Sequence, residues 1–492
     1  MNTKIINGKL RRTLSFSILL FSTYLLFSCG GGGSDDSGDG NDSDGGSDSS
    51  SGLNLPDLVN ASFMLDVDKD GDLDIILGAQ NDIDRGYDIL LLNDGLGNFT
   101  ERDNSFPMHH LGSDGATVNI TSADFNNDGN PDIIASTSDA RVDSFDDTIQ
   151  IHLYLGDGTG NFSDATSNIS DSLVTQYIEW IRVADFDNDG NIDFLITSNG
   201  GPDVETLGHG GRIYLNDGDA NFSIATIVST DAERSYTDTR LFWENDGNVF
   251  PTNEGSNRYA LDVFVDDLNG DNIPDLIANN SFTGAGPVVV SFLNTSTAGN
   301  LSFDIVYNLN DPVDPFTGTV FKNGTMLDID GDGKKDIVGS NSISGVPETT
   351  TPLYAFLSQG NGVFVEDNSV FAPTQPGVEH ARQWLVDDFD QDGNDDLIVA
   401  DHGYDLPTFP GAQNLLLINN GAGQLLDSSA SNLSTLNGFT HGGSTGDVNG
   451  DGFPDLFLNN AVILEGNPFF TAENEARLWI NDGDGSFTAA DL

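Results

Sequence analysis

The sequence predicts an all-β fold over residues 53–492, a seven-bladed β-propeller of four-stranded antiparallel blades. An acidic motif of nine residues occurs seven times, and its first Asp residues are 58, 61, 82, 61, 60 and 59 residues apart. A hairpin motif follows each copy in phase, and the flanking segments have the composition of strands. Only the third interval carries an insertion. The acidic motif occupies residues 66–74, 124–132, 185–193, 267–275, 328–336, 388–396 and 447–455.

The segments on both sides of each acidic motif have the composition of strands. A short alternating apolar run such as "ASFML" (61–65) comes before the motif, and a run such as "DIIL" (74–77) follows at once. These runs contain β-branched and apolar residues and lack helical periodicity. The acidic motif is therefore expected to form the loop between the first and second strands of a blade.

The hairpin motif supplies the other two strands. It consists of an apolar run, a turn of Gly, Asn or Asp, and then an aromatic residue or Leu, which is typical of a β-hairpin. A linear array of such units is the alternative, but four antiparallel strands per repeat favour radial packing. The copies are "LLNDGLGNF" (91–99), "YLGDGTGNF" (154–162), "YLNDGDANF" (214–222), "FLNTSTAGNLSF" (292–303), "FLSQGNGVF" (356–364), "LINNGAGQL" (417–425) and "WINDGDGSF" (479–487).

Together the two motifs resemble the FG-GAP/VCBS repeats, the calcium-loop blades that also build the propellers of integrin α-subunits. The resemblance covers about residues 60–490 in seven copies. The "FG…GAP" letters themselves are poorly kept, so the VCBS-type variant is the more similar. The resemblance implies a propeller with one calcium loop in each blade.

The chemistry of the loop also points to Ca²⁺, up to seven ions with a structural role. Ca²⁺ takes six to eight oxygen ligands and tolerates irregular geometry, which short Asp and Asn side chains on a tightly turning backbone can provide. Gly at position 6 permits a positive φ, and Asn272 replaces it in the fourth loop. The ligands expected at positions 1, 3, 5, 7 (through the carbonyl) and 9 are Asp66, Asp68, Asp70, Asp72 and Asp74; Asp124, Asn126, Asp128, Asn130 and Asp132; Asp185, Asp187, Asp189, Asn191 and Asp193; Asp267, Asn269, Asp271, Ile273 and Asp275; Asp328, Asp330, Asp332, Lys334 and Asp336; Asp388, Asp390, Asp392, Asn394 and Asp396; and Asp447, Asn449, Asp451, Phe453 and Asp455.

Three other interpretations of the acidic loops are weaker. An EF-hand or dockerin loop is followed by a helix, whereas "DLFLNN" (455–460) has the composition of a strand. Thrombospondin-type calcium repeats place such loops much closer together. Solvated acidic turns without metal would leave carboxylates clustered at fixed positions, where they repel one another.

The N-terminus predicts export and a lipid anchor. Four basic residues precede the apolar run "LSFSILLFSTYLLF" (14–27), which is typical of a signal peptide over residues 1–28. "LFSC" (26–29) resembles the lipobox of bacterial lipoproteins, which implies lipidation of Cys29; an ordinary signal with a chance Cys is the alternative. Residues 29–52, rich in Gly, Ser and Asp, then form a flexible tether. We expect a bacterial cell-envelope location, with the outer membrane favoured because Gly30 follows the Cys.

The charge of the chain limits its partners. With 18 basic and 78 acidic residues, the formal net charge is −60. Such a surface repels nucleic acid and anionic lipid, so no nucleic-acid partner is expected. The membrane is expected to be reached only through the lipid at Cys29.

The ligand is expected on the face opposite the calcium loops. Strand 1–2 and 3–4 turns share one face, whereas the long variable connections lie on the other and carry most of the scarce cationic and aromatic side chains. Binding surfaces of propellers are commonly built from such connections. A carbohydrate or a protein ligand is expected there; the alternative for each residue is that it balances local acid or fills a blade interface. The candidates are His209, Arg212, Trp243, Arg258, His380, Arg382, His402, Tyr404 and His441.

The function predicted is a binding or adhesion module, and an enzyme is the rival class. Some polysaccharide lyases are propellers, and His402, Tyr404 and Arg382 could serve proton abstraction. No motif of a nucleophile with its base appears, however, and the scarcity of Lys argues against binding a polyuronate.

Overall fold

The structure is a computed structural model of the chain. It describes residues 53, 55–56, 59–79, 87–109, 115–139, 149–174, 177–199, 211–230, 235–238, 242–243, 258–259, 262–279, 289–308, 323–340, 350–404, 408–461, 472 and 477–492. The predicted signal peptide, Cys29, the tether and His209 lie outside this part. Within it, no helix is long and apolar enough to cross a membrane.

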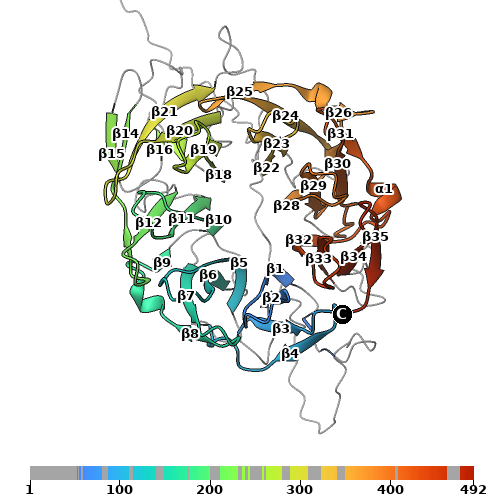
Figure 1. Ribbon diagram of the computed structural model, residues 1–492, viewed down its shortest axis with the longest axis horizontal. Coiled ribbons are helices and arrows are strands. Elements are labelled where there is room, and N and C mark those ends of the chain that lie inside the picture. The colour runs from blue at the N-terminus through green and yellow to red at the C-terminus, as the bar shows by residue number, and fades with distance from the viewer. Residues whose placement is uncertain are drawn as a thin grey trace, which may run out of the picture.

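Seven antiparallel sheets are arranged in a ring, as Figure 1 shows, so the predicted seven-bladed propeller is confirmed. In each blade the first strand lies nearest the ring axis and the fourth lies at the rim. The blades are β1 (Val59–Leu65), β2 (Asp74–Ala79), β3 (Ile89–Asn93) and β4 (Phe99–Arg102); β5 (Gly115–Ala123), β6 (Asp132–Asp139), β7 (Ile149–Gly156) and β8 (Phe162–Asp164); β10 (Tyr177–Ala184), β11 (Asp193–Asn199), β12 (Arg212–Asn216) and β13 (Phe222–Ile224); β18 (Asp262–Asp266), β19 (Asp275–Asn279), β20 (Val289–Asn294) and β21 (Ser302–Asn308); β22 (Asn323–Leu327), β23 (Asp336–Ser340), β24 (Thr351–Gly360) and β25 (Val363–Glu366); β28 (Ala381–Asp387), β29 (Asp396–Asp401), β30 (Leu415–Asn419) and β31 (Leu425–Asp427); and β32 (Thr440–Gly446), β33 (Asp455–Asn460), β34 (Leu478–Asn481) and β35 (Phe487–Ala490).

Several blades carry extra strands that the sequence did not predict. In two places an extra strand in the connection from one blade pairs in parallel with the rim strand of the next, β14 with β21 and β26 with β31, and a single parallel bridge, Ile169 with Phe222, does the same between blades 2 and 3. The two strand pairings cover the outer edges of blades 4 and 6, which would otherwise expose unpaired backbone groups. The remaining elements are β9 (Leu173–Val174), β14 (Ile227–Thr230), β15 (Ser235–Asp238), β16 (Phe242–Trp243), β17 (Arg258–Tyr259), β26 (Phe371–Ala372), β27 (Gly377–Val378), α1 (Ser429–Asn432), η2 (Thr166–Asn168) and η3 (Asn368–Val370).

Apolar side chains fill the interfaces between neighbouring blades. Between blades 3 and 4, for example, Phe186, Phe292 and Phe303 are fully buried in one cluster. Burying apolar surface is the main favourable term in folding. Each such interface is formed by two neighbouring blades. A complete ring therefore also requires an interface between the last blade and the first.

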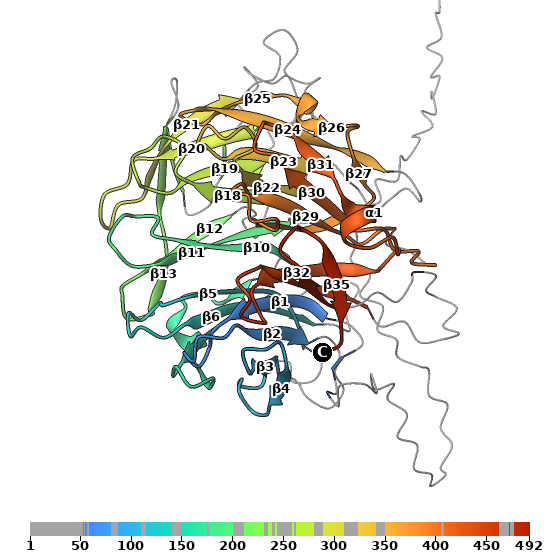
Figure 2. The same cartoon turned by 45° about the vertical axis from the view of Figure 1, so that its right-hand side comes forward.

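Blade 1 is built from the start of the domain and blade 7 from its end. The ring is therefore closed by side-chain contacts between these two blades. Blades 1 and 7 lie side by side in both views (Figures 1 and 2). Ser62 Oγ and Ser444 Oγ are 3.2 Å apart across this junction. Leu53 and Leu55 pack against the shared apolar cluster, and Arg477 Nη2 donates to the carbonyl of Pro56 at 2.8 Å. The first residues of the domain therefore fasten the junction without adding a strand to the last blade in the described part of the chain.

A buried Asn in the hairpin motif links successive blades, a role that the sequence analysis missed. In five blades its Nδ2 donates at 2.7–3.0 Å to a loop carbonyl of the preceding blade. Asn93 does this across the ring closure, to the carbonyl of Val448. The motif is therefore a hairpin and also a link between blades. The five residues are Asn93, Asn216, Asn294, Asn419 and Asn481.

We expect Asn419→Ala to lower the free energy of unfolding by about 1–3 kcal/mol, because it leaves buried backbone groups without partners. Asn419 is fully buried, donates to the carbonyl of Asp328 and accepts from the N–H of Gly421. The matched control is Asn420→Ala, an exposed change in the same turn. Urea denaturation of both variants measures the effect, and equal midpoints would contradict the proposed link between blades.

Candidate metal centres and the opposite face

The acidic motifs form seven similar loops between the first and second strands of the blades. In the second loop, Asp124 accepts the N–H of Asp128 at 3.0 Å and of Gly129 at 2.8 Å. The third loop repeats this pattern with Asp185 as the acceptor. The Asp at position 1 thereby folds the backbone around its own carboxylate. In four of the loops the side chains at positions 1 and 3 lie close to a third carboxylate, from position 5 or position 9.

Two positions of each loop adopt the left-handed conformation. Position 6 has a positive φ in all seven loops, including Asn272 at +66°, as predicted. Position 4 also has a positive φ, which the sequence analysis missed; Lys69 and Asn127, for example, are at +63° and +56°. The only hint in the sequence is that position 4 holds Gly or Asn in five of the seven loops.

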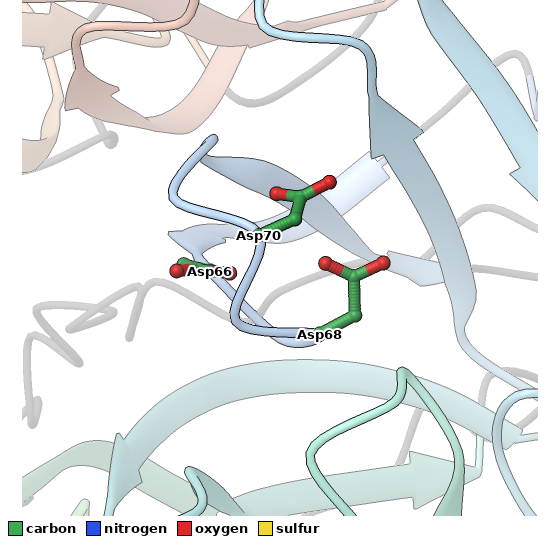
Figure 3. A group of neighbouring side chains, drawn as sticks. All are labelled: Asp66, Asp68 and Asp70. Atoms are coloured by element: carbon green, nitrogen blue, oxygen red, sulfur yellow. The ribbon is translucent and has the colours of Figure 1, made fainter.

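Four loops bring three carboxylates close together. One oxygen from each of the three residues lies within 4.8 Å of the others, about twice a calcium–oxygen distance. Figure 3 shows the first group on its loop. Loops 2, 4 and 7 have Asn at position 3, so they cannot form the same group of acids. The four groups are Asp66, Asp68 and Asp70; Asp185, Asp187 and Asp193; Asp328, Asp330 and Asp332; and Asp388, Asp390 and Asp396.

The oxygens of these groups suit a hard cation. Among the described residues, the Oδ1 atoms of Asp66, Asp68 and Asp187 are buried and accept no hydrogen bond. Burial, with the neighbouring Asp70 and Asp66 charges, raises the pKa of Asp68; burial, with the neighbouring Asp189, raises that of Asp187. Buried carboxylates without partners are costly, and a divalent cation relieves both the burial and the mutual repulsion. The residues therefore fit a bound Ca²⁺.

The Asp at position 9 joins the acidic loop to the hairpin. Its Oδ2 accepts the N–H of the second loop residue at 2.9–3.1 Å, in all seven blades. Its Oδ1 accepts an N–H from the end of the third strand at 2.5–2.9 Å. The acidic loops and the hairpins therefore lie on the same face, as predicted.

The environment of this carboxyl group raises its pKa. Burial has the largest effect, opposed by the two N–H donors and increased by the other loop carboxylates. It raises the pKa of Asp396 to about 7 and that of Asp193 to about 8. In Asp74, Asp132, Asp275, Asp336 and Asp455 it raises the pKa to about 6.

The side chain at position 7 covers the Gly of the hairpin turn. A Cβ on Gly95 would lie 2.4 Å from the carboxylate of Asp72, and one on Gly218 would lie 2.7 Å from Oδ1 of Asn191. These glycines also have positive φ angles, +75° and +89°. The expectation that position 7 serves only through its carbonyl therefore left out this contact, which packs the acidic loop against the hairpin turn of its own blade.

Neighbouring loops also touch one another along the ring. Lys69 Nζ in the first loop donates to Asn130 Oδ1 in the second at 2.8 Å. Asn127 Nδ2 in the second loop donates to Asn191 Oδ1 in the third at 3.2 Å. In both cases position 4 of one loop reaches position 7 of the next. This face is thus occupied by loops that hold the blades together.

The opposite face gathers four of the predicted ligand residues. Arg382 and His441 lie on the innermost strands of blades 6 and 7, and His380 and His402 lie beside them at the ends of strands. His402 Nε2 and His441 Nε2 are 3.2 Å apart, and the rings of His380 and His402 are 5.3 Å apart. The buried carboxylate of Asp401 accepts the N–H groups of His380 and Gly403. This backbone anchoring fixes the positions of two of the imidazoles.

Burial keeps two of these imidazoles neutral at pH 7. It lowers the pKa of His441 to about 3, assisted by the charge of Arg382. It also lowers the pKa of His402 well below the usual value, with further contributions from His441, Arg382 and His380. A neutral imidazole has one N–H donor and one acceptor nitrogen. The pair can therefore both give and take hydrogen bonds.

The other predicted ligand residues do not join this group. Arg212 lies on β12 in blade 3, where its Nη1 is 3.3 Å from Asp171 Oδ2. Trp243 and Arg258 face each other in the β16–β17 pair, of which only the backbone is described. Tyr404 is half-buried two residues beyond His402.

Comparisons with known proteins agree with the repeats. The FG-GAP-like repeat family model matches residues 66–135, 142–196 and 388–458. The matched segments lie in blades 1 to 3, 6 and 7 of the propeller and are similar to FG-GAP-like repeats. No curated protein matches the sequence.

Two solved structures illustrate what the chain is similar to. BBS1N, crystallised in complex with ARL6DN, is 10% identical with a TM-score of 0.42, covering 85% of this chain and 96% of that one. The α-L-arabinofuranosidase CtGH43 from Clostridium thermocellum is 11% identical with a TM-score of 0.28, covering 60% and 89%. At these scores neither likeness bears on what this chain binds.

Proposed function

We propose that this chain is a lipid-anchored propeller of the bacterial cell envelope that binds a carbohydrate or protein ligand. Calcium in the acidic loops stabilises one face, and the ligand binds to the other. One observation carries the proposal: the acidic loops are tied to tight hairpins on their face, while a group of one Arg and three His gathers on the opposite face. Cationic and imidazole side chains are scarce in this chain, so their concentration at one place favours a binding role there.

A glycan array combined with assays for lyase and hydrolase products tests this function on the purified protein. The proposal expects saturable binding of a saccharide, or of a protein from the cell surface, without turnover. Formation of a cleaved product at a rate that depends on the protein would overturn it in favour of a carbohydrate-active enzyme.

The lipid anchor is tested separately through Cys29. We expect the protein to partition into the detergent phase of a Triton X-114 extract and Cys29→Ser to move it to the aqueous phase, because the lipid supplies the membrane affinity. Ser28→Ala is the control. Aqueous partitioning of the unchanged protein would contradict the anchor.

A further inference from the structure

Among the described residues, the innermost strands of blades 6, 7, 1, 2 and 3 each contain a β-bulge near the face opposite the acidic loops, and the first three of these bulges carry polar side chains. The regular pairing breaks at Asn60 in β1, at Arg382 in β28, and at His441 and Gly442 in β32. A bulge releases a residue from the ladder and re-aims its side chain, and bulges are common beside functional sites. All three bulged side chains are half-buried, on strands that border the ring axis.

These three bulges lie side by side. Strand β32 lies between β28 and β1 in Figure 1. Ser62 and Ser444 are within hydrogen-bond distance, and each lies two residues beyond its bulge, so Asn60 and Gly442 are at the same level. On the other side, Gln383 Oε1 accepts the N–H of Gly443 at 2.9 Å. The bulges therefore form one continuous polar lining across three blades.

Buried polar atoms without partners are concentrated at this lining. Asn459 is fully buried opposite the bulge of β32, and among the described residues neither its Nδ2 nor its Oδ1 has a hydrogen-bond partner. The same holds for Nδ2 of Asn60 and Nδ1 of His441. A buried polar atom without a partner destabilises the folded state, so native proteins rarely keep several at one place without a function.

The charge of the lining selects the ligand. Arg382 contributes a guanidinium group in a chain with a net charge of −60, and a guanidinium pairs best with a carboxylate. The amides and neutral imidazoles beside it both donate and accept hydrogen bonds, as sugar hydroxyls require. The single guanidinium group of Arg382 can pair with one carboxylate, so the lining suits a ligand with one negative charge rather than a polyanion.

We propose that this lining, formed by Asn60, Arg382, Gln383, His402, His441 and Asn459, binds an acidic saccharide whose single carboxylate pairs with Arg382. The amides of Asn60 and Asn459 take the hydroxyl groups. This assignment rests on the proposed binding function and gives it a site and a ligand class.

Calorimetric titration with a glucuronate-ended disaccharide and its glucose-ended counterpart tests the site. We expect the acidic sugar to bind more tightly, and Arg382→Gln to weaken its binding about 10- to 100-fold, the loss of one charge-assisted contact. Arg102→Gln, at the rim and bonded to Asn161, is the charge-matched control and should bind normally. Equal binding by the Arg382→Gln and unchanged proteins would overturn the site.

Asn459→Ala provides a second test that does not depend on the charge. Because the amide lacks partners without ligand, its removal should leave the melting temperature unchanged or raise it, while weakening the binding of the acidic sugar. A lowered melting temperature with unchanged affinity would mean a structural Asn and would overturn the site. Binding of neutral sugars alone would also overturn the site but leave the proposed function standing, whereas sugar cleavage would overturn the function.

Discussion

Chelation of calcium is expected to lower the melting temperature of the protein and the midpoint of its urea denaturation. A ligand that binds only the folded state stabilises it by about 2.7 kcal/mol per site at 100 times its dissociation constant, and the chain has seven loops. The structure explains why the loss should be large. Without a cation, unpartnered buried oxygens such as Asp187 Oδ1 stay close to other carboxylates.

Differential scanning calorimetry in EGTA, followed by recovery in excess Ca²⁺, measures this effect. The control is Mg²⁺ at the same concentration, which requires near-ideal octahedral geometry at shorter distances and should restore less stability. The same melting curve in EGTA and in Ca²⁺ would contradict the structural role of calcium.

Replacement of the buried Asp at position 9 is expected to have the largest effect of any single substitution in a loop. Asp396 is fully buried, and it accepts the N–H of Phe389 at 2.9 Å and that of Asn419 at 2.7 Å. Asp396→Ala leaves both donors unpaired, at about 1–3 kcal/mol each, and removes one carboxylate of its acidic group. The free energy of unfolding should fall by about 2–6 kcal/mol.

Urea denaturation of this variant in both Ca²⁺ and EGTA separates its two roles. The variant lacks the hydrogen bonds of Asp396 in both conditions. The unchanged protein gains stability from bound metal only when Ca²⁺ is present, so the loss in free energy of unfolding caused by the substitution should be larger in Ca²⁺ than in EGTA. Asp219→Ala, which removes an exposed carboxylate in a hairpin turn, should stay within about 0.5 kcal/mol of the unchanged protein. A variant as stable as this control would contradict the role of Asp396.

Much of the fold could be predicted from the sequence because the repeats report on local structure. The seven acidic loops fix where the second strand of each blade begins, and the apolar runs fix its length. The edge strands β14 and β26 could not be predicted, because their partners β21 and β31 are distant in sequence and the segments carry no repeated motif. Position 4 of the loop was missed because Lys69 and Gln391 adopt positive φ angles that their residue types do not suggest.

The two faces of the propeller differed in how well they could be predicted. The residues of the acidic loops are adjacent in sequence, so spacing alone indicated that they converge. On the opposite face, His380, Arg382, His402 and His441 come together from two blades, and only the three-dimensional arrangement separates them from Arg212 in blade 3. Asn60 and Asn459 gave no signal, since nothing in a single Asn predicts a bulge or an unpaired buried amide.

The number of calcium ions bound by the purified protein tests the central claim most directly. Native mass spectrometry after dialysis against Ca²⁺, with metal analysis of the same sample, counts the ions on each chain. The account predicts several ions, up to seven, one for each acidic loop, all removed by EGTA. A protein that stays folded and binds no calcium would contradict it.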